Sequence, residues 1–187
     1  MIAGHFGIAF GLRAARRDVP LVPLLVASIL PDIVDMAYAA ARFCSPMGLY
    51  SHSPAAIGIL ACLTFAGALI ATGNRGASAV LAIAVLLHAP ADWITGEKLL
   101  WTNGPVVGFG LYRHPVADFL LEVPIAAIGW QALRRDARAP RWAVSGAALA
   151  LLIAGQAAFD GLKLLGHPGK PSGCVAGSLV PGPSADP

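Results

Sequence analysis

A histidine and an aspartate stand four residues apart at the end of an apolar run. The run covers residues 77–87, and the motif His88-x-x-x-Asp92 follows it directly. In a helix, residues at this spacing lie on the same face. Ionisable groups are costly within a membrane, and those that occur there usually serve a function. This imidazole and carboxylate therefore predict a metal site or a proton site, provided that the helix lies in a membrane.

The composition indicates an integral membrane protein. Of the 187 residues, 57% are hydrophobic and 12% are charged, and the mean hydropathy is +0.69. Soluble domains average about 25% charged residues. The net charge of +3 does not indicate a nucleic-acid partner, because the basic residues fall where loops between helices are expected. Membrane lipids are the partners that this composition predicts.

The hydropathy pattern predicts an all-α, polytopic membrane helix bundle of about five to six helices. The first helix is too short to cross a membrane alone, and Pro31 should interrupt the second. Residues 1–166 form the expected helical domain, and the Pro/Gly-rich tail 167–187 is expected to be disordered. The expected helices cover residues 2–14, 20–42, 53–73, 77–95, 115–133 and 142–165, with loops at 43–52 and 96–114.

The basic residues predict which side of the membrane each loop faces. Eight of the 13 fall in loops on one side: Arg13, Arg16, Arg17, Arg75, Arg134, Arg135, Arg138 and Arg141. The positive-inside tendency places this side in the cytoplasm of a multi-pass inner-membrane protein. Both chain termini should then face outward.

Counting residues from the cytoplasmic arginines gives the depth of each polar group. At 1.5 Å per residue, His5, Asp32, His88 and Glu122 lie about 18 to 22 Å from that side, each on a different helix. The groups one turn further out, at roughly 24 to 27 Å, are Asp35, Asp92 and Asp118. His52 and His114 come out near the outer rim. These depths predict one polar site that opens to the non-cytoplasmic side.

The residue types at these positions suit a divalent metal ion. Histidine and carboxylate side chains are the ligands of zinc, manganese and iron. A metal would also supply the counter-charge for the carboxylates, because none of these helices carries Lys or Arg at that depth. Zinc is the simplest expectation, with manganese and iron as alternatives.

Each polar residue also has a simpler structural explanation. His5 could be a hydrogen-bonded packing residue, and Ser51 or Ser53 could merely cap a helix next to His52. Asp32 could favour the start of a helix that resumes after Pro31. Asp92 and Asp118 could be solvated at the interface. The matched depths favour a common site over these separate explanations.

Four short motifs resemble those of the membrane-bound metal-dependent hydrolase family, which includes the LexA-regulated inner-membrane hydrolases. They are Gly4-His5, Pro31-Asp32-x-x-Asp35, Ser51-His52-Ser53 and His88-x-x-x-Asp92. The stretch 108–112, with Glu122 further on, also resembles a related group of bacterial membrane proteins. The similarity covers roughly residues 4–125.

The resemblance implies a metal site made of six residues: His5, Asp32, Asp35, His52, His88 and Asp92. The chain departs from the family before Ser51, where a His-Arg-Gly is common and this sequence has Met47-Gly48-Leu49-Tyr50. That departure removes one candidate ligand and one candidate anion-binding arginine.

The leading hypothesis is a metal-dependent hydrolase. His5, Asp32, His52, His88 and Asp92 would hold the metal. A bound metal would lower the pKa of a water molecule.

The remaining carboxylates are the candidates for acid–base work. Asp35 or Glu122 would serve as general base, and Asp118 would orient a ligand histidine. A site open at the outer leaflet suits a lipid-linked or phosphoester substrate, with Arg113 at the rim as a phosphate partner.

Two other functions remain open. One is a small proton- or metal-ion-coupled transporter, and the other is a non-catalytic membrane protein with structural polar groups. The short chain shows no inverted repeat, which disfavours a transporter, although a homodimer would supply what one chain lacks.

Overall fold

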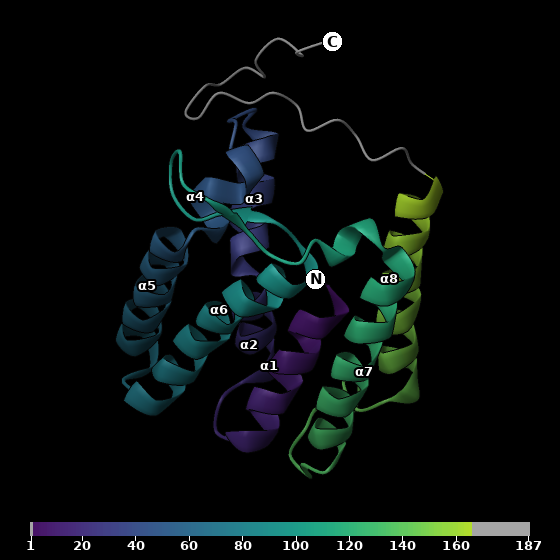
Figure 1. The fold of residues 1–187 in the computed structure, drawn as a ribbon. Coiled ribbons are helices and arrows are strands. Elements are labelled where there is room, and N and C mark those ends of the chain that lie inside the picture. The colour runs from purple at the N-terminus through teal and green to yellow at the C-terminus, as the bar shows by residue number, and fades with distance from the viewer. Residues whose placement is uncertain (1, 166–187) are drawn as a thin grey trace.

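The computed structural model describes residues 2–165 and is an all-α bundle with one short hairpin (Figure 1). The predicted tail, 167–187, lies outside these residues. The main helices are α1 (Ala3–Ala15), α2 (Leu21–Ser28), α3 (Leu30–Ala40), α5 (Pro54–Thr72), α6 (Arg75–Thr95), α7 (Pro115–Arg134) and α8 (Gly146–Leu165). Over the described residues, four helices are long and apolar enough to cross a membrane, or five if the bent pair α2–α3 forms one span. The predicted fold class is confirmed.

The predicted interruption of the second helix occurs just before Pro31. The helix breaks at Ile29, and α2 and α3 meet there at an angle of 57°. Proline lacks an N–H, and its ring clashes with the carbonyl four residues earlier, so it kinks or breaks a helix. By contrast, α6 continues through Pro90 to Thr95. The bend places Asp32 in the first turn of a new helix.

The helix α1 lies between α6 and α7 near the middle of the bundle (Figure 1). Its contact with α7 is so close that a Cβ atom on Gly129 would lie 2.0 Å from the Gly7 carbonyl oxygen. Small residues allow this approach of two backbones in membrane bundles. The opposite faces of α5, α7 and α8 expose large apolar side chains, as lipid contact requires, among them Ile59, Leu63, Ile70, Val116, Leu120, Ile128, Leu151 and Leu162.

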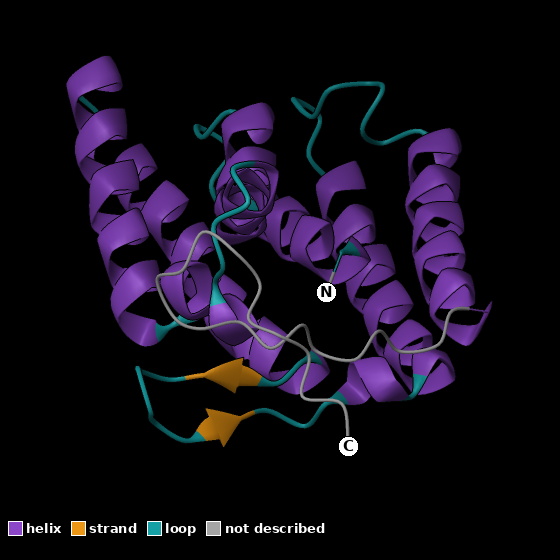
Figure 2. Cartoon of the chain, turned by 90° about the horizontal axis from the view of Figure 1, so that it is seen from above, coloured by secondary structure: helices purple, strands orange, loops and turns teal. Residues whose placement is uncertain are grey.

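The two segments expected to be loops contain short regular elements. Residues 43–52 contain a 3₁₀ turn, η1 (Pro46–Gly48), and one turn of helix, α4 (Leu49–His52). Residues 96–114 contain the antiparallel strands β1 (Lys98–Leu99) and β2 (Val106–Val107), and the turn η2 (Leu111–Arg113). Figure 2, which looks down on the bundle from above, shows this hairpin along one side of it. These short elements carry residues into the site described below.

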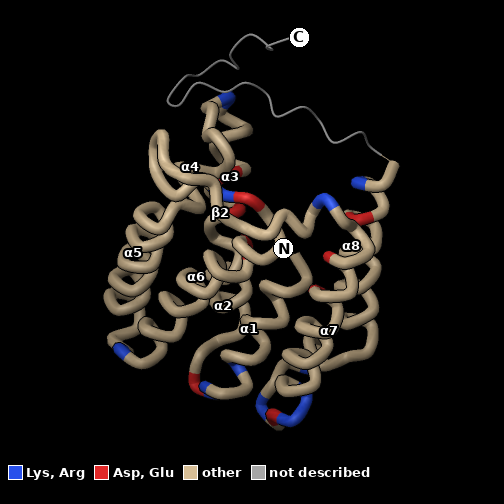
Figure 3. Tube along the Cα trace, in the orientation of Figure 1, with Lys and Arg blue, Asp and Glu red and all other residues tan. Residues whose placement is uncertain are grey.

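The loops at the other end of the bundle carry most of the basic residues. The α1–α2, α5–α6 and α7–α8 connections lie together at the lower end in Figure 3 and contain the blue segments. This is the grouping predicted from the sequence. It leaves the hairpin and α4 at the opposite, predicted outer end.

Candidate metal centre

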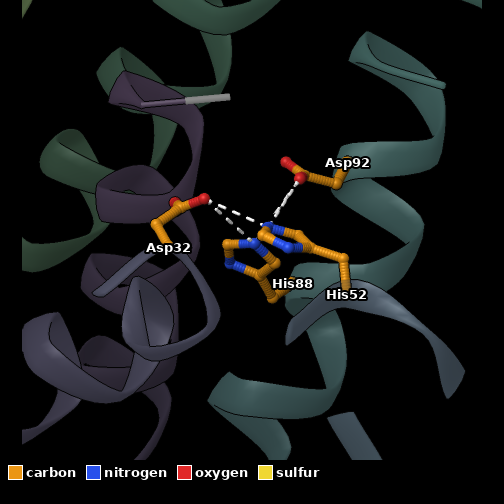
Figure 4. A group of neighbouring side chains, drawn as sticks. All are labelled: Asp32, His52, His88 and Asp92. Carbon is orange, nitrogen blue, oxygen red and sulfur yellow. Dashed lines mark hydrogen bonds and ion pairs between the residues drawn. The ribbon is translucent and has the colours of Figure 1, made fainter. Parts of the chain in front are cut away.

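Four of the predicted metal ligands converge on one point (Figure 4). Asp32 comes from α3, His52 from the end of α4, and both His88 and Asp92 from α6. One ligand atom from each residue lies within 4.8 Å of all the others. His52, His88 and Asp92 are buried, whereas the Asp32 side chain is 39% exposed. Asp32 therefore forms the accessible edge of the group.

The protonation of His88 follows from its one hydrogen bond. Its Nδ1 lies 2.8 Å from the Ser28 carbonyl oxygen, which only accepts, so Nδ1 must carry the hydrogen. In the neutral ring, Nε2 then presents a lone pair. This atom is buried and makes no hydrogen bond within residues 2–165, yet it lies 3.7 Å from Asp32 Oδ1 and 3.6 Å from Asp92 Oδ2. A lone pair that faces two carboxylates requires a cation or a proton between them.

The orientation of His52 is fixed from behind in the same way. Ser51 Oγ lies 2.8 Å from Asp35 Oδ1 and 2.7 Å from His52 Nδ1. Because an ionised carboxylate only accepts, the Ser51 hydroxyl donates to Asp35 and accepts from His52 Nδ1. In the neutral ring, His52 Nε2 is then a lone pair, at 3.1 Å from Asp32 Oδ1 and 3.2 Å from Asp92 Oδ2.

Backbone geometry brings His52 inward from the rim, where counting along the helices places it. Gly48 has a φ of +71°, and a Cβ there would lie 2.9 Å from His52 Nδ1. This turn reverses the chain direction before α4, so the assumption of a continuous rise does not hold. Ser53 caps α5 by accepting a hydrogen bond from the Ala56 amide at 3.3 Å, as one of the structural alternatives predicted.

The predicted ligand His5 lies beside the four-residue group. Its Nε2 donates to Asp92 Oδ1 at 3.2 Å, and its ring stacks on His88 with centroids 3.9 Å apart. In this arrangement His5 holds the carboxylate of Asp92 while the other Asp92 oxygen faces His52 and His88.

Lys98 is the site residue that the sequence analysis missed. Its Nζ lies 3.0 Å from Asp92 Oδ2 and the side chain is 16% exposed. The expectation that no basic group offsets these carboxylates is therefore wrong, because a lysine reaches in from β1 rather than from a helix. Its position six residues after Asp92, in a glycine-bounded loop, was the only signal in the sequence.

The spacing of the four ligand atoms fits a small divalent ion. Zinc bound tetrahedrally at about 2.0 Å would hold its ligand atoms about 3.3 Å apart. The four histidine–aspartate separations, 3.1, 3.2, 3.6 and 3.7 Å, lie near this value, and the remaining two pairs of ligand atoms lie within 4.8 Å. Metal-bound histidines also donate their second N–H to a carbonyl, a carboxylate or a water. His88 does so to Ser28, and His52 is linked to Asp35 through Ser51.

The predicted residues on α7 lie in a second polar group. Glu122 Oε2 accepts from the amides of Ile2, at 2.7 Å, and Gly4, at 3.3 Å. Asp118 Oδ2 pairs with Lys163 Nζ at 2.9 Å. Neither carboxylate belongs to the four-residue group, and α1 lies between the two clusters. The polar residues predicted at one depth thus form two groups rather than one.

At the rim, Arg113 forms an ion pair with Glu97, and its side chain is 70% exposed. A cavity of about 450 Å³ lies beside it at the start of α7, and none of its lining residues belongs to the metal group. Arg113, His114, Pro115, Val116, Ala117 and Leu120 line this cavity.

The chain matches no family model, no curated protein and no solved structure. The assignment of this centre therefore rests on the geometry above. What the structure establishes is a set of membrane-span-like helices and a buried His/Asp group that could hold a divalent metal.

Proposed function

We propose that this protein is a multi-pass inner-membrane, metal-dependent hydrolase. The observation that supports the metal is the pair of Nε2 atoms, on His52 and His88, that face two carboxylate oxygens at ligand spacing. The resemblance of the four sequence motifs to membrane-bound hydrolases supports the reaction class. Zinc is the expected ion, with manganese and iron as alternatives.

A divalent metal held by Asp32, His52, His88 and Asp92 would supply a water of lowered pKa and would polarise the bond to be cleaved. Four protein ligands fill a tetrahedral ion, so hydrolysis requires either a larger coordination number or the displacement of one ligand by water. Asp32 is our candidate for that ligand, because its side chain is the least buried of the four. In that role the Asp32 carboxylate would also be close enough to accept a proton from the water.

The remaining polar groups have supporting roles in this proposal. Asp35, expected as general base, contacts the centre only through Ser51, so we assign it to orienting His52. His5 holds Asp92. Lys98 lies beside Asp92 and would attract an anionic substrate to the exposed edge. A lipid-linked or phosphoester substrate would carry the negative charge that Lys98 attracts, and it would reach the site from the membrane.

The first experiment measures metal content by mass spectrometry on detergent-purified protein. Wild type should contain zinc, manganese or iron near one equivalent, and His88→Ala should lose it, because one of two imidazole ligands is gone. His114→Ala is the matched control, since that histidine is exposed and outside the group. Wild type that neither copurifies with nor rebinds a divalent metal would contradict the proposal.

A second measurement tests the reaction. Wild-type protein in mixed micelles should release phosphate from a lipid phosphomonoester, and both a chelator and His88→Ala should abolish the release. Metal-loaded protein that hydrolyses no phosphoester would remove the hydrolase assignment and leave a metal-binding membrane protein.

A further inference from the structure

The first turn of α1 is held by side chains from other helices. Its residues supply no side-chain cap of their own. Instead Glu122 Oε2 accepts from the Ile2 and Gly4 amides, and Gln156 Oε1 accepts from the Ala3 amide at 3.3 Å. The first amides of a helix have no partner within it, so these contacts satisfy three of them.

Gln156 is itself fixed by a buried polar chain. Its Nε2 donates to Asp160 Oδ2 at 2.8 Å, and Lys163 Nζ lies 2.9 Å from both Asp160 Oδ1 and Asp118 Oδ2. Glu122, Gln156 and Asp118 are completely buried. The chain thus connects α7 and α8 to the amino end of α1.

His5 follows Gly4 in this same turn and donates to Asp92. The helix axis cannot shift sideways toward α7, because the backbones of Gly7 and Gly129 are already in contact. The Glu122 and Gln156 contacts fix the remaining freedom, which is the rotation and rise of the first turn. A change there would move the His5 ring away from Asp92 Oδ1 and off the face of His88.

We propose that Glu122 and Gln156 are positioning residues for the metal centre, which act by clamping the first turn of α1 and thereby His5. This inference rests on the proposed function. In this proposal the second polar group stabilises the geometry of the metal group and takes no part in proton transfer at the reacting atoms. Asp160, Lys163 and Asp118 act behind Gln156.

The test compares Zn²⁺ affinity, by competition with a chelator, in Glu122→Leu and Gln156→Leu. Both should bind Zn²⁺ about tenfold more weakly, as is typical when a group that supports a ligand is lost. Glu122→Gln should stay near wild type, because an amide oxygen still accepts from α1. The other oxygen, Glu122 Oε1, makes no hydrogen bond within the described chain, so the substitution removes none there.

A double-mutant comparison separates this role from general stability. In a His5→Ala background, Glu122→Leu should weaken Zn²⁺ binding no further, although it should still lower the thermal stability of the metal-free protein. Additive losses of affinity would overturn the proposal, because the clamp would then act other than through His5. Equal losses in Glu122→Gln and Glu122→Leu would overturn it too.

Hydrogen exchange tests the clamp on α1 separately from metal binding. The Ala3 and Gly4 amides should exchange faster in Gln156→Leu and Glu122→Leu respectively, measured on metal-free protein. If wild type binds no metal while these amides are protected, the proposed function fails, and the role of Glu122 and Gln156 at a metal centre fails with it. The clamp on α1 is then confirmed as a structural contact alone. If the amides exchange freely in wild type, the clamp itself is wrong.

Discussion

Ser51 is the residue through which Asp35 acts on His52. Its hydroxyl has one hydrogen, which faces two acceptors, Asp35 Oδ1 at 2.8 Å and the Gly48 carbonyl oxygen at 3.2 Å, so its oxygen accepts from the imidazole. This arrangement directs the Nε2 lone pair of His52 toward Asp32 and Asp92. Of the two aspartates in the Pro-Asp-x-x-Asp motif, Asp32 therefore belongs to the metal group, and Asp35 supports His52 through Ser51.

Ser51→Ala should weaken Zn²⁺ binding by about 10- to 100-fold without abolishing it, because His52 remains but its tautomer and orientation are no longer fixed. Chelator competition on purified protein measures this change. Ser53→Ala is the control, since that hydroxyl caps α5 instead. Affinities that fall equally in both variants would show that Ser51 has no special role.

Lys98 shows how a charge outside the helices alters the electrostatics of the centre. A carboxylate at membrane depth needs a compensating charge, and the ammonium group at 3.0 Å provides one to Asp92. A metal must therefore compete with Lys98 for the same oxygen. The histidine lone pairs, which Lys98 does not satisfy, remain the stronger argument for a metal.

At the scale of elements, the contact between α1 and α7 sets the distance between the two polar groups. A Cβ on Gly129 would lie 2.0 Å from the Gly7 carbonyl oxygen, and a Cβ on Gly7 would lie 2.5 Å from the Ile125 carbonyl oxygen. Backbone atoms cannot move aside singly, so any larger residue would force the helices apart.

Gly129→Ala should destabilise the protein by about 3 kcal/mol, since two packed helices must separate. Gly11→Ala, on the same α1 helix, meets no atom within 4 Å and should stabilise the protein by up to about 1 kcal/mol. Thermal unfolding in detergent compares the two. A similar effect of both substitutions would mean that α1 and α7 are not in backbone contact.

At the scale of the whole molecule, the two ends of the bundle differ in charge. The arginine-rich connections lie at one end, while the hairpin, α4 and the exposed edge of the metal group lie toward the other. From the positive-inside tendency we predict that the arginine-rich end faces the cytoplasm. Substrate would then reach Asp32 from the outer side of the membrane.

Cysteine labelling tests this orientation. Trp101→Cys, in the hairpin loop, should react with a membrane-impermeant maleimide in intact cells, and Arg138→Cys should react only after the cells are opened. Both positions are exposed, so burial does not limit the reaction. The parent protein corrects for its native cysteines. The reverse pattern would place the metal group toward the cytoplasm.

From the sequence alone we predict helices of membrane-spanning length, an all-α bundle and the four members of the candidate metal group. Apolar runs of membrane length leave the backbone no alternative to helices. The i, i+4 spacing alone places His88 and Asp92 on one helix face. Counting along helices also predicted that Asp32 and His88 lie at one depth.

Which polar residues come together depends on the packing of the helices. Depth along a helix says nothing about the rotation of that helix, so Glu122 shares a level with His88 but contacts the amides of α1 instead. The inward turn at Gly48 and the reach of Lys98 arise in segments without a regular repeat. Periodicity predicts faces of regular helices, whereas contacts between helices, and those made by loops, depend on how the whole chain packs.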